Sequence, residues 1–198
     1  MCIDANPWNG VEMALLFVNA CMREGSRTER LARAWLDRRG CDFEEVRLAE
    51  DCVDAFDAES IKVYQAAVAS GDFSHPMFEP AKKLACAEEI AIAAPLWNFA
   101  LPARLMAYLE ACCTQGISFD IGASGEYVSL AHARRLTLIS TSGGAWPEAQ
   151  DDHAFGYLKT LASVFWHIPE VTKIVASGLD AAGNDVETLL VSALTDAI

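Results

Sequence analysis

The chain has 198 residues, of which 53% are hydrophobic and 22% charged, and its formal net charge at pH 7 is −13. This length suffices to bury the core of one domain, and the acidic balance argues against nucleic acid or an anionic membrane surface as a partner. No apolar run reaches the length of a membrane span, and the first residues lack the basic region of a signal peptide. We therefore expect a cytoplasmic protein, with residues 1–12 as a tail and residues 13–198 as one domain.

Seven cysteines are spread along the chain, and none of them forms a C-x-x-C pair. An odd number with this spacing fits neither a disulfide framework nor a zinc site, so we expect reduced cysteines and no bound metal. Most of them should be small buried residues. Cys21 is the exception to watch because it falls in a candidate ligand loop, although packing is favoured there over a redox role.

Apolar runs of strand length alternate with segments of helical spacing, which predicts an α/β fold with a parallel sheet. Five strands indicate a doubly wound sheet in the order 2-1-3-4-5, with a switch point between the first and third strands. Glu44 and Glu45 suggest that the second strand lies near an edge. The strands are expected at residues 13–20, 43–48, 89–94, 135–140 and 171–176, and the helices at residues 27–39, 60–69, 80–87, 103–113, 152–166 and 185–197.

Two segments interrupt this alternation. The polar loop from Gly71 to Pro76 contains His75 and is a natural place for a lid or an interface. Residues 121–126 form a Gly/Ser-containing excursion after the segment 116–120.

The stretch from Glu89 to Phe99 is the segment around which we expect the site to form. It begins as a short apolar run, and Pro95 then ends the strand because proline has no N–H to donate. The residues after Pro95 therefore leave the sheet at the carboxyl end of a central strand, where ligands of open α/β sheets bind. Trp97 offers a stacking face and Asn98 offers hydrogen-bonding groups, which suit a flat ring rich in heteroatoms.

Two other loops are expected at the same edge of the sheet. The first places Ser26, Arg27 and Thr28 at the start of a helix, where unpaired N–H groups and the helix dipole favour a phosphate. It lacks the motifs of an NTP P-loop and of a Rossmann dinucleotide site. The second ends in Gly143 and Gly144, which form either a simple turn or a backbone surface against which a ring can lie. One phosphate site beside a flat-ring site describes a mononucleotide.

The segment Ala94-Pro95-Leu96-Trp97-Asn98-Phe99, followed by Leu101-Pro102, resembles the flavin loop of flavodoxin-like NAD(P)H:quinone reductases, and most of all the FMN-dependent NADH-azoreductases. Gly116-Ile117-Ser118-Phe119 is similar to the G-[VI]-[TS]-F segment of that group, and Thr141-Ser142-Gly143-Gly144 resembles its second ring-binding loop. The order and spacing agree from about Met13 onward. The resemblance implies a flavodoxin-like fold and a homodimer with FMN at the subunit interface.

The resemblance also implies which residues form the site. The chain departs from the family at Asn19-Ala20-Cys21, where a serine is frequent, and at Ser142, where an arginine is frequent. Phe119, Trp146, His153 and Phe155 are expected to wall the substrate cleft, with His153 as a candidate proton donor. The implied cofactor-binding residues are Ala20, Ser26, Arg27, Thr28, Pro95, Leu96, Trp97, Asn98, Phe99, Thr141, Ser142, Gly143 and Gly144.

The expected activity is a ping-pong reaction in which NADH or NADPH reduces FMN and a small aromatic acceptor, such as a quinone or an azo compound, is reduced next. The flavin supplies the chemistry, so no side-chain nucleophile is required. A flavodoxin-type electron carrier without NAD(P)H activity is the alternative. A flavodoxin-like binding protein without flavin also remains open. A response-regulator-like domain is disfavoured because it needs an aspartate at the end of the third strand, where this chain has Pro95.

Overall fold

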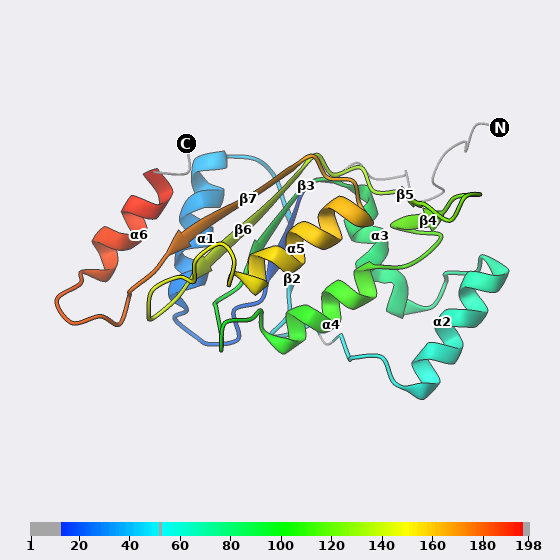
Figure 1. The fold of residues 1–198 in the computed structure, drawn as a ribbon, viewed down its shortest axis with the longest axis horizontal. Helices are drawn as coiled ribbons and strands as arrows, with labels where there is room; N and C mark the ends of the chain where they lie inside the picture. Colours follow the sequence, from blue (N-terminus) through cyan, green and yellow to red (C-terminus); the bar gives the residue numbers. More distant parts are fainter. Residues whose placement is uncertain (1–12, 52, 196–198) are drawn as a thin grey trace.

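A computed structural model describes residues 13–51 and 53–195 (Figure 1). Five parallel strands form one sheet in the order β2-β1-β3-β6-β7, which confirms the predicted order 2-1-3-4-5 and the flavodoxin-like arrangement. Helices cover both faces of this sheet (Figure 1). The tail expected before Met13 lies outside the described residues.

Most of the observed helices and strands begin and end within a few residues of the predicted bounds. The strands of the sheet are β1 (Met13–Asn19), β2 (Glu44–Arg47), β3 (Ala87–Ala93), β6 (Arg135–Thr141) and β7 (Glu170–Ala176). The helices are α1 (Arg27–Arg39), α2 (Ala58–Ser70), η1 (Pro76–Phe78), α3 (Glu79–Cys86), α4 (Ala103–Cys112), α5 (His153–Val164) and α6 (Val186–Thr195). None of the helices in these described ranges combines the length and the apolarity needed to span a bilayer.

The region after α4 contains a short hairpin that was not predicted. Strands β4 (Phe119–Ile121) and β5 (Tyr127–Ser129) pair antiparallel, apart from the main sheet. The connection between them contains most of the residues that were expected to form an irregular excursion. Strands of three residues are too short to show the alternation of polar and apolar residues by which a strand is recognised.

The central strands are buried because helices pack on both of their faces. Side chains of β1 alternate between the two layers, so Leu16 and Val18 pack on the face of α4 and α5, whereas Leu15 and Phe17 pack on the face of α1 and α6. The acidic strand β2 pairs only with β1 in the described sheet, as expected for an edge strand.

The helix ends that shape the site follow local sequence signals. Ser26 caps α1, since its Oγ accepts a hydrogen bond from the Glu29 amide at 3.4 Å. Gly40 ends the helix with a φ of 59°, which glycine adopts without strain. Pro102 precedes the first residue of α4, close to the predicted start.

Helix α2 projects away from the sheet and is held by a small separate core (Figure 1). Phe73 in the following loop is only 7% exposed and packs edge-to-face on Phe78, with ring centres 5.2 Å apart. His75 accepts a hydrogen bond from the Met77 amide through Nδ1 at 3.2 Å and so caps η1. The loop is therefore anchored along part of its length, and its role as a lid or interface stays a prediction.

In the segment Gly116-Ile117-Ser118-Phe119, the structure explains why the first three residue types suit their positions. Gly116 has a φ of 84°, and a Cβ atom there would lie 2.8 Å from the ring of Phe73. Ile117 is fully buried in the small core beside α2. Ser118 is also fully buried, and its Oγ donates to the Cys112 carbonyl at 2.6 Å, which satisfies the end of α4.

Candidate functional site

The carboxyl ends of the parallel strands surround a pocket of about 250 Å³. It unites the three loops that the sequence placed at this edge, and it adds a fourth, the connection between β7 and α6. The pocket is lined by Met22, Arg23, Ser26, Arg27, Thr28, Pro95, Leu96, Trp97, Thr141, Gly143 and Asp180. Of the predicted cofactor residues, Ala20, Asn98, Phe99, Ser142 and Gly144 do not line it.

The start of α1 forms one wall of this pocket. The N–H groups of the first helical turn have no acceptor within the helix, and the helix dipole adds positive character there. Ser26 is 6% exposed, and its hydroxyl retains a hydrogen to donate while its oxygen caps the helix. Thr28 is nearly fully buried, and its Oγ1 lies 2.6 Å from Thr141 Oγ1. Thr28 therefore links the first loop to β6 as well as facing the pocket.

The segment after β3 forms the opposite wall. The strand ends at Ala93 before Pro95, as predicted, but the chain continues beside β6. The amides of Ala94 and Leu96 donate to the carbonyls of Ile139 and Thr141, each at 3.0 Å. Leu96 is thereby held against the strand end, and the chain first turns away at Trp97.

A tight turn at the tip of this segment was not predicted. Trp97 and Ala100 exchange two backbone hydrogen bonds of 3.0 and 2.9 Å, and the central residues Asn98 and Phe99 have φ angles of 51° and 61°. Two consecutive positive φ values indicate a type I′ turn. Asparagine tolerates this conformation, whereas phenylalanine is strained in it, and such strain is concentrated at functional sites.

The side chains of this turn are unusually exposed for their type. Trp97 is 46% exposed and Phe99 is 65% exposed. In a turn of this kind, the amides of the two central residues make no hydrogen bond within the turn. Their N–H groups and the Trp97 ring are thus available to a ligand or to a second protein surface.

The loop after β6 is fixed by the β7–α6 connection. The carbonyls of Ser142, Gly143 and Gly144 accept hydrogen bonds from the amides of Leu179, Asp180 and Gly178 at 3.2, 2.9 and 2.8 Å. Ser142 Oγ also donates to the Gly144 carbonyl at 2.7 Å. The loop is therefore held in one conformation by backbone contacts.

Gly143 makes room for a side chain from the same connection. A Cβ atom at Gly143 would overlap Asp180 Oδ2, whereas Gly144 faces open space. The sequence suggested that both glycines let a ring lie against the backbone. At Gly143 the neighbour is the Asp180 carboxylate, and the contact of either glycine with a ring stays a prediction.

Arg27 is paired in this structure. Its Nη1 donates to Asp180 Oδ1 at 2.8 Å and to the Leu179 carbonyl at 3.2 Å. The hydrogen bond from Arg27 lowers the pKa of Asp180 below its ordinary value, so the carboxylate is ionised at neutral pH. Sequence reasoning missed Asp180 because it belongs to no motif. Its position shortly after the last strand, at the ligand edge of the sheet, is the only signal that was present.

Two residues at the end of β1 contribute packing. Ala20 is fully buried, and its amide donates to the Ala93 carbonyl at 2.8 Å, so its side chain adds no surface to the pocket. Cys21 is 3% exposed, and burial raises the pKa of its thiol to about 11. A buried, protonated thiol is a poor nucleophile, which favours the packing role over the redox role.

The four predicted cleft residues do not gather in one place within the chain. Trp146 donates from Nε1 to Asp152 Oδ2 at 2.7 Å, and the Lys173 ammonium lies 5.4 Å from the Trp146 ring and 5.0 Å from the Phe155 ring. Trp146 and Phe155 thus enclose a lysine. His153 is exposed at the first turn of α5.

Phe119 lies elsewhere, in the β4–β5 hairpin. It is 8% exposed and packs on Phe165 and Tyr127, with ring centres 4.7 and 5.7 Å apart. Sequence spacing did not reveal this separation because the hairpin was not recognised. A contribution of Phe119 to a cleft beside Trp97 is therefore not supported within one copy of the chain.

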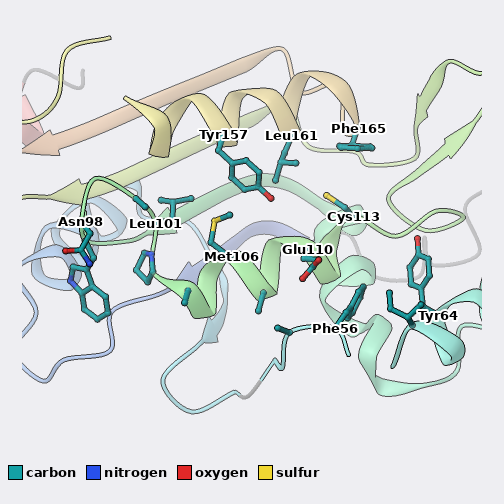
Figure 2. Close-up of a pocket in the computed structure, with 17 residues that line it drawn as sticks. Phe56, Tyr64, Asn98, Leu101, Met106, Glu110, Cys113, Tyr157, Leu161 and Phe165 are labelled. Carbon is teal, nitrogen blue, oxygen red and sulfur yellow. The ribbon is translucent and has the colours of Figure 1, made fainter. Parts of the chain in front are cut away.

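A second, larger depression of about 850 Å³ begins at the Trp97–Asn98 turn. It runs along α4, with α5 on one side and α2 on the other, from Asn98 at one end to Phe165 and Tyr64 at the other (Figure 2). We call this depression the α4 groove. Most of its lining is apolar, and Glu110 is its one acidic side chain among the described residues. Trp97 lines both the α4 groove and the smaller pocket.

Among the residues of 13–51 and 53–195, no group of three or more His, Cys, Asp or Glu side chains is arranged to hold a metal ion. The polar groups of the pocket are hydroxyls, amides, arginines and one aspartate. These groups suit an anionic organic ligand.

Known proteins are similar to this chain in sequence and in fold. An FMN-dependent NADH:quinone oxidoreductase 2 of Clostridium acetobutylicum is 35% identical over 135 residues, which cover 67% of this chain and 66% of the relative. An FMN-dependent NADH:quinone oxidoreductase of Clostridium beijerinckii is 32% identical over 124 residues, which cover 63% of this chain and 62% of the relative. These alignments thus span slightly less than two thirds of each relative's length.

A solved structure resembles the whole fold. The FMN-dependent NADH-azoreductase from Bacillus anthracis str. Ames Ancestor, determined in complex with FMN, superposes with a TM-score of 0.76 and 20% sequence identity. The superposition covers 93% of this chain and 95% of the azoreductase. Residues 13–197 match the family described by a flavodoxin-like fold, so the chain belongs to that family, as the resemblance of its loops predicted.

Proposed function

We propose that this chain is an FMN-dependent NAD(P)H oxidoreductase that reduces quinones, azo compounds or related aromatic acceptors by ping-pong two-electron transfer. The observation that carries the proposal is the small pocket, which combines a helix start with the exposed tryptophan turn at the carboxyl edge of the sheet. The names of the relatives and of the superposed azoreductase support the same activity.

The residues of the pocket fit the phosphate end of FMN. The Ser26 hydroxyl and the first-turn amides of α1 supply donors, and Arg27 supplies a positive charge. A volume of about 250 Å³ is small for a whole flavin. We therefore assign this pocket to the phosphate and the adjoining chain, with the ring outside it against Trp97.

Bound FMN supplies the redox chemistry of the reaction. The protein's part is to orient the ring and to set its electrostatic surroundings. In this proposal Trp97 provides an apolar face, and the free amides of Asn98 and Phe99 donate hydrogen bonds to the polar edge of the ring. The loop of residues 141–144 holds the other side, because its backbone is already fixed by the β7–α6 connection.

We also propose that the working form is a homodimer whose interface is the α4 groove. Along it, Ile61, Trp97 and Met106 are 38%, 46% and 37% exposed. Such a large exposed apolar surface on a chain of net charge −13 is typical of a protein–protein interface. Phe119 packs on Phe165, at the opposite end of the groove from Asn98 (Figure 2). The predicted place of Phe119 in the substrate cleft thus requires the hairpin of a second copy.

Sedimentation velocity tests the dimer. A Met106→Glu variant should sediment as a monomer and lose FMN affinity, because a charge is placed in an apolar interface. Val191→Glu is the control, since Val191 is 57% exposed on α6, on the other face of the sheet. A wild-type monomer that binds FMN normally at micromolar concentration would contradict the proposal.

The net charge of −13 also leads us to propose that neither nucleic acid nor an anionic membrane surface is a partner, and we keep the cytoplasmic location expected from the sequence as a proposal. Fractionation of cells that produce the protein at its native level tests this. Recovery in the membrane pellet after a high-salt wash would be the opposite result.

Anaerobic titration of the FMN-loaded protein with NADH and then NADPH tests the activity. One nucleotide should bleach the flavin absorption band, and a quinone added afterwards should restore it. Initial rates measured against the concentration of the nucleotide, at several fixed quinone concentrations, should give parallel double-reciprocal lines. Flavin that binds but stays oxidised with both nucleotides would instead identify a flavodoxin-type electron carrier.

A further inference from the structure

The phosphate pocket contains a carboxylate that opposes its proposed ligand. Asp180 lines the pocket together with Ser26 and Thr28, and its side chain lies beside Gly143, where any Cβ would overlap it. Its backbone amide is bound to the Gly143 carbonyl at 2.9 Å, so the residue is held at the pocket by the main chain. A resident anion at an anion site is an unexpected feature of the chain.

The same carboxylate engages the arginine that would bind a phosphate. Arg27 Nη1 lies 2.8 Å from Asp180 Oδ1, and the Arg27 side chain is 25% exposed. A guanidinium that already donates to a carboxylate has fewer donors and less net charge to offer to a phosphate. An FMN phosphate carries about −1.5 to −2 charges at pH 7, so it is repelled by the carboxylate while it is attracted by the arginine.

The Asp180 side chain is free to leave. It is 67% exposed, and within the described residues Arg27 is the one side chain that hydrogen-bonds to it. Exposed ion pairs of this kind contribute little to stability. Binding can therefore proceed by exchange, in which Arg27 transfers its hydrogen bond from Asp180 to the phosphate and the carboxylate turns toward water.

We propose that Asp180 is an affinity-setting residue that competes with the cofactor phosphate for Arg27 and so weakens cofactor binding. This inference rests on the proposed FMN site and identifies the residue that tunes it. The opposite role, in which Asp180 orients Arg27 for the phosphate, predicts the opposite sign when the carboxylate is removed.

The test is the dissociation constant of FMN and of riboflavin, which lacks the phosphate, measured with the full-length apoprotein by quenching of flavin fluorescence. Asp180→Asn should bind FMN about 10-fold more tightly than the wild type, with riboflavin affinity unchanged. Asp180→Ala should shift FMN affinity in the same direction. Asp37→Asn removes the same charge from the exposed far end of α1 and should change neither constant.

A double-mutant cycle sharpens the result. Arg27→Gln should weaken FMN binding more in the Asp180→Asn background than in the wild type, because the arginine is no longer shared. Unchanged or weaker FMN binding by both Asp180 variants would overturn this inference while leaving the FMN site intact. Failure of the wild type and all variants to bind FMN at millimolar concentration would overturn the proposed function and this inference together.

Discussion

Two groups of charged side chains meet helix α1, and they differ in how completely they are bound. In the first, which we call the closed cluster, Glu29 and Glu45 accept hydrogen bonds from Arg33 at 3.2 and 2.6 Å, and Asn19 donates to both carboxylates at 3.0 Å. The carboxylate side chains are 21% and 23% exposed. In the second, the open pair, Arg27 contacts an Asp180 that is 67% exposed.

This difference in exposure and hydrogen bonding distinguishes a group that stabilises the fold from a group that can bind a ligand. Both groups lie near the carboxyl ends of parallel strands, the side of the sheet where ligands bind, although Asn19 and Glu45 of the closed cluster still belong to β1 and β2. In the closed cluster Glu29 also accepts from Arg47 at 2.7 Å, so its Oε1 accepts from three protein donors, Asn19, Arg33 and Arg47. The open pair has a partner that can leave. The position at the sheet edge is thus shared, but only the open pair can exchange a protein contact for a ligand.

The largest effect should follow from breaking the closed cluster. Glu29→Gln removes the charge that Arg33, Arg47 and Asn19 share, and the free energy of unfolding should fall by about 2 kcal/mol, reduced from the fully buried case because the site is partly exposed. Urea denaturation measures this, and FMN affinity should not change. A loss of FMN affinity with unchanged stability would reverse the assignment of the two groups.

Breaking the open pair should have the opposite effects, with a loss of FMN affinity and little change in stability. Arg27→Gln should weaken FMN binding about 10-fold, by about 1.4 kcal/mol, while the free energy of unfolding changes by less than about 0.5 kcal/mol. Arg30→Gln is the control, because Arg30 forms a pair with a similarly exposed carboxylate, Glu187, further along α1 and outside the pocket. Equal effects of the two substitutions on FMN affinity would show that Arg27 has no specific role.

The strained turn on the other side of the pocket should respond to glycine. Phe99→Gly relieves a positive φ of 61° and should raise the free energy of unfolding by about 1 kcal/mol. Asn98→Gly should change it by less, because asparagine tolerates this region. Thermal denaturation of the two variants compares them. A destabilised Phe99→Gly would mean that the phenyl ring contributes more through packing than the turn costs.

The smallest effect concerns pH. Burial raises the pKa of Glu29 and Glu45, but hydrogen bonds from Arg33 and Asn19 to both carboxylates, and from Arg47 to Glu29, outweigh it. Both pKa values therefore lie below the ordinary 4.5. Their contribution to stability is therefore present above pH 4.5 and is lost as the pH falls below it, by less than about 1 kcal/mol for each carboxylate. Urea denaturation between about pH 3 and 6, a range that includes this titration, measures the loss. The free energy of unfolding of Glu29→Gln should fall less steeply with decreasing pH than that of the wild type.

Sequence reasoning succeeded where the signal is continuous along the chain. Apolar runs locate the central strands β1, β3 and β6 because those strands are buried on both faces. Their alternation with helices fixes the parallel order, and Pro95 marks the end of β3 as expected. The three loops that meet in the pocket follow from that order, since the carboxyl ends of parallel strands share an edge.

The features that sequence reasoning missed depend on contacts between distant segments, or on residue types that are unusual for their backbone conformation. Asp180 reaches the pocket only because backbone hydrogen bonds join the β7–α6 connection to residues 142–144. The turn at Asn98 was not predicted because Phe99 is a residue type that rarely adopts a positive φ. The partners of Glu45 were also hidden, since an acidic residue on an edge strand is ordinarily exposed to water.

A crystal structure of the protein grown with FMN tests the central claim most directly. We expect phosphate density between Ser26 and Thr28 at the start of α1, the isoalloxazine ring against Trp97, and the Arg27 guanidinium turned from Asp180 to the phosphate. Density for FMN placed elsewhere, with the Arg27–Asp180 pair intact and the pocket occupied only by water, would contradict the account.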